Sequence, residues 1–214
     1  MSLKVVFSCL ALAALPAFGG ERLVEFPAAL YATFQHQPPV IVRHALEDEV
    51  ESIMGPLGRH FVWRSLAGVN GHEISSELAV LTFKGRCNVE GLTLKEVHPG
   101  ALGWTHVSDG AILPFSEIDC DRIRLFVQKE LLFRKPAERE EIFGRALARV
   151  VAHELYHIFA NTPHHGSDGV AKAAYTSQEL LCDDFVFEEV QSAALRSSIP
   201  PKHPRSQTAT SPSL

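Results

Sequence analysis

The residues with the clearest chemical potential are two histidines and a glutamate in the stretch VVAHELYHIFANTPHH, residues 150–165. His153, Glu154 and His157 form the pattern H-E-x-x-H. On a helix this spacing places both imidazoles on one face, one turn apart, where they can bind a single metal ion. Neutral imidazole nitrogens suit zinc. Glu154 would lie beside the metal and could accept a proton from water, whose pKa the ion lowers.

The helix that would carry these residues is expected to be buried. It should begin at Pro136, with acidic residues in its first turn, where the helix dipole favours negative charge. Apolar residues cover most of its circumference: Ile142, Phe143, Leu147, Val150, Val151, Leu155, Ile158 and Phe159. Three ionisable groups inside such a helix are costly unless they have partners, and a metal ion would satisfy all three. The alternative is a pair of core histidines bonded to backbone groups.

Zinc catalysis also requires a third protein ligand and an open fourth position. The sequence offers His164 and His165 in the segment after the helix, and Glu179 further on. His164 and His165 are rivals, because adjacent residues point to different sides. Spacing alone leaves the choice among these three residues open.

The stretch resembles the metzincin branch of the zinc metallopeptidases, whose usual pattern is H-E-x-x-H-x-x-G-x-x-H. Ala160 stands at the glycine position of that pattern and Pro163 at its last histidine. The stretch is more similar to a looser group of predicted bacterial metzincin-like proteases. Their pattern is H-E-x-x-H-x-x-x-G-x-x-x-H, followed by a loop of small residues that ends in Gly-Ile-Met.

Carried over to this chain, the resemblance places Asn161 at the turn glycine and His165 at the third ligand. Asparagine is the next best residue for a left-handed turn. Residues 169–171, Gly-Val-Ala, fall where Gly-Ile-Met would be, so the usual methionine is missing. The resemblance covers residues 145–171 strongly and the preceding part only in the order of its elements. It implies that His153, His157 and His165 bind zinc.

A second resemblance concerns Glu179, which lies with Asp183 on an expected helix. In the gluzincin plan a glutamate on the helix after H-E-x-x-H is the third ligand, and an aspartate one turn later steadies a ligand histidine. The alternative interpretation is an exposed helix start with acidic residues. Two weaker candidates follow the H-E-x-x-H helix: Tyr175 as an oxyanion donor or a packing residue, and Asp168 as a partner of a ligand histidine or a turn residue.

The remaining elements predict an α+β fold. Apolar, β-favouring runs predict strands at residues 60–65 and 77–85, and a hairpin formed by residues 101–107 and 111–118. Pro114 removes a donor from the second arm, so we expect that arm at a sheet edge. Helical patterns predict helices within residues 40–55, 121–133 and 177–197, although a strand is possible for the middle of residues 121–133. We expect a small mixed sheet packed on a long central active-site helix, followed by a short, mostly helical C-terminal part. His72, His98 and His106 fall in the β-rich half and are expected at the surface, although His106 alternates with Leu102 and Trp104 and could face the cleft.

The two ends of the chain differ from its middle. Lys4, the apolar run over residues 5–18 and the small residues that follow predict a secretory signal peptide at residues 1–19. Residues 197–214 have little to bury, which predicts a disordered tail. A single domain over residues 20–196 remains, and no later segment is apolar enough to cross a membrane. We therefore expect a secreted or periplasmic protein.

Charge and cysteine content narrow the possible partners. The net charge of −5 gives no electrostatic reason to bind nucleic acid. After signal cleavage Cys87, Cys120 and Cys182 remain, without a C-x-x-C pair. An oxidising compartment allows one disulfide, and Cys87 with Cys120 is the expected pair.

Together these features predict an exported, monomeric zinc metalloendopeptidase. Glu154 would be the general base, and an extended peptide would lie between the sheet edge and the central helix. Two alternatives remain: a non-catalytic zinc-binding protein with a closed set of four ligands, and a zinc amidohydrolase of gluzincin type with Glu179 as third ligand.

Overall fold

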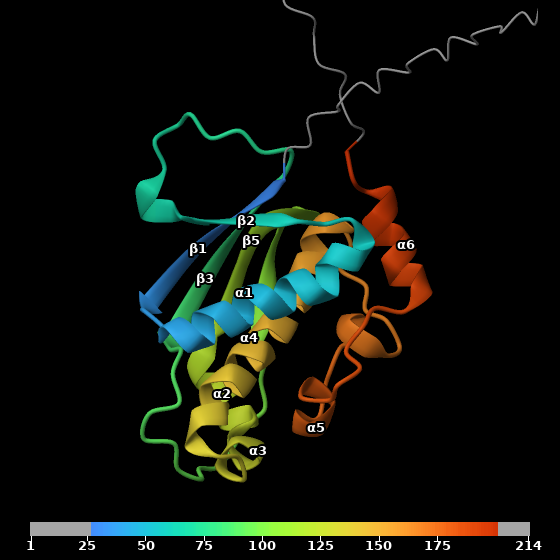
Figure 1. The fold of residues 1–214 in the computed structure, drawn as a ribbon. Helices are drawn as coiled ribbons and strands as arrows, with labels where there is room; N and C mark the ends of the chain where they lie inside the picture. The colour runs from blue at the N-terminus through green and yellow to red at the C-terminus, as the bar shows by residue number, and fades with distance from the viewer. Residues whose placement is uncertain (1–26, 201–214) are drawn as a thin grey trace, which may run out of the picture. The chain divides into compact units, whose positions relative to one another are not determined.

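The structure, a computed structural model, describes residues 27–200. These residues form a five-stranded sheet in the order β2-β1-β3-β5-β4 (Figure 1). Only β4, at one edge, runs antiparallel to its neighbour, β5. The strands are β1 Ala28–His36, β2 Phe61–Ser65, β3 Leu78–Arg86, β4 Gly103–Ser108 and β5 Ala111–Asp119. The prediction of an α+β fold with a small mixed sheet is thus confirmed.

Strand β1, near the centre of the sheet, was not among the expected elements. It pairs with β2 on one side and β3 on the other, and its residues Ala29 and Leu30 are fully buried. A strand that is buried on both faces is a continuous apolar run and lacks the alternation that marks a half-buried strand. The sequence AALYATFQH fits that description better than it fits a period of two.

The expectation that the arm containing Pro114 forms the sheet edge is wrong. Strand β5 lies inside the sheet, and β4 is the edge strand. The pairing of β5 with β3 begins at Phe115, opposite Val80, directly after the proline. Pro114 therefore lies where β5 has β4 but not β3 beside it, so its missing N–H costs no hydrogen bond in the ladder with β3.

Helices α1 (Val40–Met54) and α4 (Pro136–Phe159) pack against each other on one face of the sheet (Figure 1). Alternate residues of β3 that face these helices are fully buried: Ala79, Leu81 and Phe83. The predicted start of the long helix at Pro136 is confirmed, and the burial of its apolar residues places it at the centre of the core. Two short helices, α2 (Cys120–Phe126) and α3 (Gln128–Leu132), precede it, as expected for residues 121–133.

The single helix expected over residues 177–197 is instead two short helices, α5 (Ser177–Leu180) and α6 (Glu189–Ser197). The buried guanidinium of Arg149, from α4, donates to the carbonyl oxygens of Leu180 and Cys182 at 2.8 and 2.6 Å. A continuous helix would need those oxygens for its own N–H groups. Phe185 and Phe187 are then buried on alternate positions, as in an extended segment.

The folded part extends slightly beyond the expected boundary at residue 196. Helix α6 includes Ser197, and Arg59 donates to the hydroxyl of Ser198 at 2.6 Å. The expected signal peptide, residues 1–19, and residues 201–214 of the expected tail lie outside the described residues. None of the helices between residues 27 and 200 combines the length and apolar character that a membrane span needs.

The structure confirms the predicted disulfide between Cys87 and Cys120. Both residues are buried, and the bond joins the segment after β3 to the first residue of α2. Cys182 is a free thiol. The disulfide thereby ties the start of the loop between β3 and β4 to α2.

The packing of α1 on α4 depends on a small residue at Gly144. A β-carbon at that position would lie 2.5 Å from the Val42 carbonyl oxygen and 2.7 Å from the β-carbon of Ala45. Both neighbours belong to α1, so the two helices would have to separate.

We predict that Gly144→Ala destabilises the protein by about 1–2 kcal/mol in chemical denaturation, because the strain of overpacking exceeds the roughly 1 kcal/mol that alanine gains as a helix former. The matched control is Gly68→Ala, where a β-carbon would meet no atom within 4 Å. Equal stability of the two variants would contradict this packing.

Candidate metal centre

Helix α4 brings His153 and His157 together on its inner face. Both are buried, with 8 and 7 % of their surface exposed. Their Nε2 atoms are 3.1 Å apart, and their rings meet edge to face. Two ligands of a tetrahedral zinc ion, each about 2.0–2.1 Å from the metal, are separated by about 3.3 Å. The helix alone therefore provides a spacing close to that of two zinc ligands.

Hydrogen bonds to backbone carbonyls fix the tautomer of both imidazoles. His153 Nδ1 donates to the Val170 oxygen at 2.8 Å, and His157 Nδ1 donates to the Thr162 oxygen at 2.7 Å. A carbonyl oxygen only accepts, so each Nδ1 carries the proton. Burial lowers the pKa of His153 to about 4 and also lowers that of His157, so both rings are neutral near pH 7. Two bare nitrogen lone pairs consequently face each other in a buried site, which is unfavourable without a cation between them.

His165 completes a group of three imidazoles. Its ring is 5.2 Å from that of His153 and 4.8 Å from that of His157, centroid to centroid. One ligand atom from each residue lies within 4.8 Å of the others. Among residues 27–200, these are the histidine, cysteine or acidic side chains that come together in a set suited to a metal ion. The structure thus brings together the three residues predicted as ligands.

The chain reaches His165 through a turn at the end of α4. Asn161 has φ of 48°, the left-handed conformation expected for the turn position. The Thr162 N–H donates to the carbonyl oxygen of His157 at 3.1 Å, which closes the end of the helix. The same Thr162 provides the carbonyl that orients His157. The turn therefore both redirects the chain and fixes a ligand.

Residues Gly169–Ala171, where the resemblance placed a methionine turn, form a short 3₁₀ helix. Gly169 has φ of 63°, and both Val170 and Ala171 are fully buried. The carbonyl oxygen of Val170 accepts from His153. In this chain the turn under the histidines is thus built by small apolar residues, and its backbone contributes a hydrogen bond to the site.

Glu154 faces the edge strand β4, where its carboxyl group is buried. Thr105 Oγ1 donates to its Oε2 at 2.7 Å, and Ser116 on β5 lies 2.8 Å from the same hydroxyl. A β-carbon at Gly103 would lie 3.0 Å from Glu154 Oε1, so the glycine leaves room for the carboxyl. Burial raises the pKa of Glu154 to about 7. The carboxyl can then exist in either protonation state near neutral pH.

Thr105 and Ser116 were not identified from the sequence. His106 was the residue of β4 considered for the cleft, but its Nε2 lies 3.3 Å from Glu117 Oε1. Trp104 is paired with the same Glu117, so Thr105 points to the opposite, helix-facing side. The alternation of side chains along β4 indicates that Thr105 and His106 face opposite sides. The position of Glu154 opposite Thr105, however, depends on tertiary packing.

A cavity of about 470 Å³ connects these groups. Its wall contains the three histidines and Glu154, together with residues of β4 and of the loop before it. Most of the remaining wall is apolar: Leu102, Ile112, Phe126, Val150, Pro163 and Ala174. The arrangement places a candidate metal site and a candidate acid–base group on one open, largely apolar cavity.

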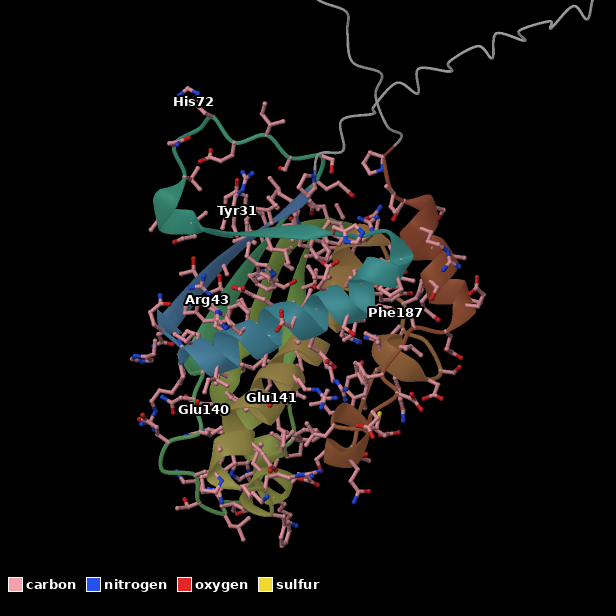
Figure 2. The ribbon with its side chains drawn as sticks, viewed as in Figure 1. Tyr31, Arg43, His72, Glu140, Glu141 and Phe187 are labelled. Atoms are coloured by element: carbon pink, nitrogen blue, oxygen red, sulfur yellow. A yellow bond between two sulfur atoms is a disulfide. The ribbon has the colours of Figure 1, made fainter. Side chains whose placement is uncertain are left out.

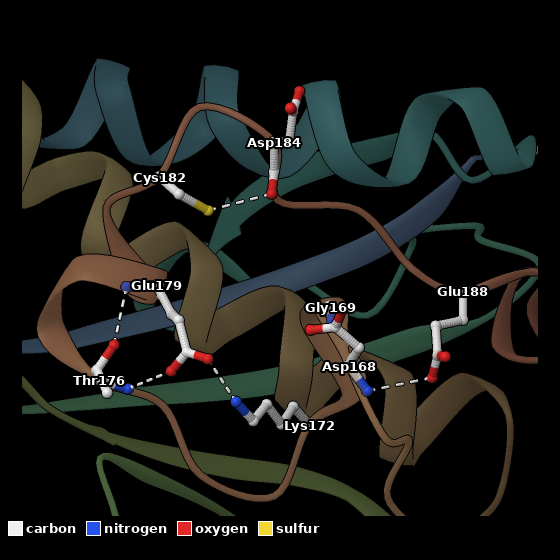
Figure 3. Close-up of polar contacts among 8 residues, drawn as sticks. All are labelled: Asp168, Gly169, Lys172, Thr176, Glu179, Cys182, Asp184 and Glu188. Atoms are coloured by element: carbon white, nitrogen blue, oxygen red, sulfur yellow. Dashed lines mark hydrogen bonds and ion pairs between the residues drawn. The ribbon is translucent and has the colours of Figure 1, made fainter.

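The other proposed ligands lie elsewhere. Glu179 accepts from Lys172 at 2.5 Å and from the Thr176 N–H at 2.7 Å in a capping box of α5 (Figure 3). The hydrogen bond from Lys172 is the main reason that the pKa of Glu179 is lowered to about 2. His164 is exposed, and its backbone N–H donates to Thr162 Oγ1. Neither residue belongs to the group of three imidazoles.

Tyr175 lies beside the histidines, whereas Asp168 does not contact them. The Tyr175 hydroxyl donates to the Val170 oxygen and is 2.9 Å from His153 Nδ1, and it also lines the cavity. Burial raises the pKa of Tyr175, so its hydroxyl stays protonated. Asp168 instead caps the Gly169 N–H. His72 lies on the loop between β2 and β3, far from α4 (Figure 2).

Comparison with known proteins assigns no relative. No protein-family model matches this chain, and no curated protein matches it. Its function is therefore inferred from the geometry of the site.

The structure predicts which histidine after the helix contributes to metal binding. His165→Ala should weaken zinc binding by more than the roughly 10- to 100-fold that follows loss of an outer-shell partner, because a direct ligand is removed. His164→Ala, its neighbour, should bind zinc as the wild type does. Affinity is measured by competition with a chromogenic chelator. Full affinity in His165→Ala, or a loss confined to His164→Ala, would contradict the geometry.

Proposed function

We propose that this protein is an exported zinc metalloendopeptidase in which His153, His157 and His165 hold zinc and Glu154 is the general base. The observation that carries the proposal is the pair of bare, buried Nε2 atoms 3.1 Å apart, with a third imidazole beside them and a carboxyl in the same cavity. The confirmed disulfide supports folding in an oxidising compartment, in line with the signal peptide predicted from the sequence.

The donor set favours zinc in a catalytic role. In catalytic zinc sites the protein provides three ligands, in some cases three histidines, and the fourth coordination position stays open. A non-catalytic structural site would be closed by a fourth protein ligand. Within residues 27–200 the candidate group has three members, and its third member is exposed to the cavity. The position of Glu179 in a helix cap likewise disfavours the gluzincin alternative.

Zinc, when bound, supplies a Lewis acid that acidifies water and polarises a carbonyl oxygen. The Glu154 carboxylate would accept a proton from the attacking water as the water oxygen bonds to the peptide carbonyl carbon. Glu154 would then give that proton to the amide nitrogen as the carbon–nitrogen bond breaks and the amine leaves. One carboxyl group next to the reacting atoms can serve in both steps, first as base and then as acid. The hydrogen bond from Thr105 would keep one carboxyl oxygen directed toward β4.

The edge strand suggests the form of the substrate. Among the described strands, β4 pairs only with β5, which leaves its outer backbone groups for an extended peptide to bind as an added strand. Gly103, Trp104, Thr105 and Val107 of this strand also line the cavity. A peptide on β4 would thus pass the histidines, and the apolar wall would receive an apolar side chain next to the bond that is cut.

The order of elements supports a metzincin-like architecture as part of the proposal. The sheet precedes the helix with H-E-x-x-H, the chain turns at Asn161, and His165 follows. A buried turn at Gly169–Ala171 then lies against that helix.

The decisive variant is Glu154→Gln, which keeps the shape but not the acid–base function. We expect retained zinc and a loss of about 10²- to 10⁴-fold in kcat on a peptide library, the usual contribution of a general base. Glu141→Gln, on the exposed side of the same helix, is the matched control and should retain full activity. Unchanged cleavage by Glu154→Gln would remove this residue from the mechanism. Zinc binding by a wild type that cleaves no peptide would favour the non-catalytic alternative.

A second variant tests the support of the general base. Thr105→Val removes the hydroxyl at nearly constant volume and leaves Glu154 Oε2 without this donor. We expect kcat to fall about 10- to 100-fold with zinc content unchanged, the range typical of lost outer-shell partners. Thr105→Ser, which keeps the hydroxyl, should restore most of the activity. Equal kinetics for the valine and serine variants would show that the hydrogen bond has no role.

A further inference from the structure

We infer that Glu188 is a positioning residue for the metal site: its carboxylate holds the loop that carries His165. The inference rests on the proposed role of His165 as the third ligand. Glu188 is the residue directly before α6, and it is separated from His165 by more than twenty positions in the sequence. Its effect on the site would therefore come from the tertiary fold.

The carboxylate of Glu188 accepts hydrogen bonds from three donor groups on the two residues that follow Gly166. The Ser167 N–H donates to Oε2 at 3.1 Å and its hydroxyl donates to Oε1 at 3.0 Å. The Asp168 N–H donates to Oε2 at 3.2 Å, as Figure 3 shows. Hydrogen bonds to an ionised acceptor are stronger than neutral ones, so this single side chain restrains both residues.

His165 depends on such a restraint because it is exposed, whereas His153 and His157 are buried. Its ring lies against those of His153 and His157. Its position is therefore set by the backbone on either side. On the far side, the Gly166 N–H donates to the Ala171 oxygen at 2.8 Å, and the bonds to Glu188 follow directly.

The loop lies close against the start of α6. A β-carbon at Gly166 would lie 2.7 Å from Gln191 Nε2 and 3.0 Å from Glu188 Oε2. The Val170 N–H donates to the Val186 oxygen at 3.0 Å, two residues before Glu188. The segment before α6 therefore follows the ligand loop along most of its length and serves as its support.

The support is in turn fixed to the helix that carries the other two ligands. Phe187, labelled in Figure 2, is buried. Its ring lies 5.7 Å from that of Tyr156, the residue before His157. Glu188 follows Phe187 directly. The two residues thus connect α4 to the His165 loop through side-chain packing on one side and hydrogen bonds on the other.

The test measures zinc affinity, which does not depend on peptidase activity. Wild type, Glu188→Ala, Glu188→Gln and His165→Ala are compared by chelator competition, together with the double variant Glu188→Ala/His165→Ala. The control is Glu189→Ala, whose side chain is 82 % exposed and pairs with Arg196. We expect Glu188→Ala to bind zinc about 10- to 100-fold more weakly, as for other outer-shell partners. Glu188→Gln should lie between it and the wild type, because an amide nitrogen cannot accept a hydrogen bond.

The double variant separates positioning from a general loss of stability. If Glu188 acts through His165, its removal should have no further effect once His165 is absent. The inference is overturned if Glu188→Ala binds zinc like the wild type, or if it weakens binding equally in both backgrounds. A wild type that binds no zinc would instead refute the metal site itself. Should Glu188→Ala not fold, the same comparison is made with Glu188→Gln in both backgrounds.

Discussion

The site depends on two hydrogen bonds from imidazole Nδ1 atoms to backbone carbonyl oxygens. The bond from His157 ends on Thr162, in the turn that closes α4, and the bond from His153 ends on Val170, in the buried turn further on. These bonds leave both Nε2 atoms without protons and facing each other. A shift of either turn away from the helix would remove the acceptor that selects this tautomer, so the chain after α4 is as much a part of the site as the helix.

The rest of the fold holds those turns against α4. Arg149, one turn before His153, has 1 % of its surface exposed and pairs with Glu49 of α1 at 2.7 Å. It also donates to the carbonyl oxygens of Leu180, the last residue of α5, and of Cys182 just beyond it. A guanidinium without these partners would be costly to bury. Burial of Arg149 therefore requires α1, α4 and residues 180–182 to pack against one another. The same contacts that prevent a long C-terminal helix therefore place the support for the ligand loop.

The sequence predicted the features that depend on residues close together in the chain, and it missed the features that depend on tertiary packing. His153, Glu154 and His157 are recognisable because one helix period relates them, and Asn161 because its residue type suits a left-handed turn. Thr105 and Glu188 could not be found this way, since a hydroxyl or a carboxylate gives no signal until packing places a partner beside it. The helix expected over residues 177–197 failed for the same reason: Arg149, distant in sequence, competes for its carbonyl oxygens. The proposed activity also depends on more than local sequence, because it depends on the metal ion and the substrate that the site binds.

Burial shifts the pKa values of the histidine and glutamate side chains in opposite directions, and both shifts favour the uncharged form. It lowers the pKa of His153 to about 4 and raises that of Glu154 to about 7, so both groups favour their neutral forms. A divalent cation would leave the imidazoles neutral and would favour the carboxylate of Glu154, because an opposite charge nearby stabilises the ionised form. The metal would therefore require no change in the protonation of its ligands, while it would convert the adjacent acid to a base. Desolvation by the surrounding core thus prepares the histidines to bind the ion and makes the state of Glu154 sensitive to its presence.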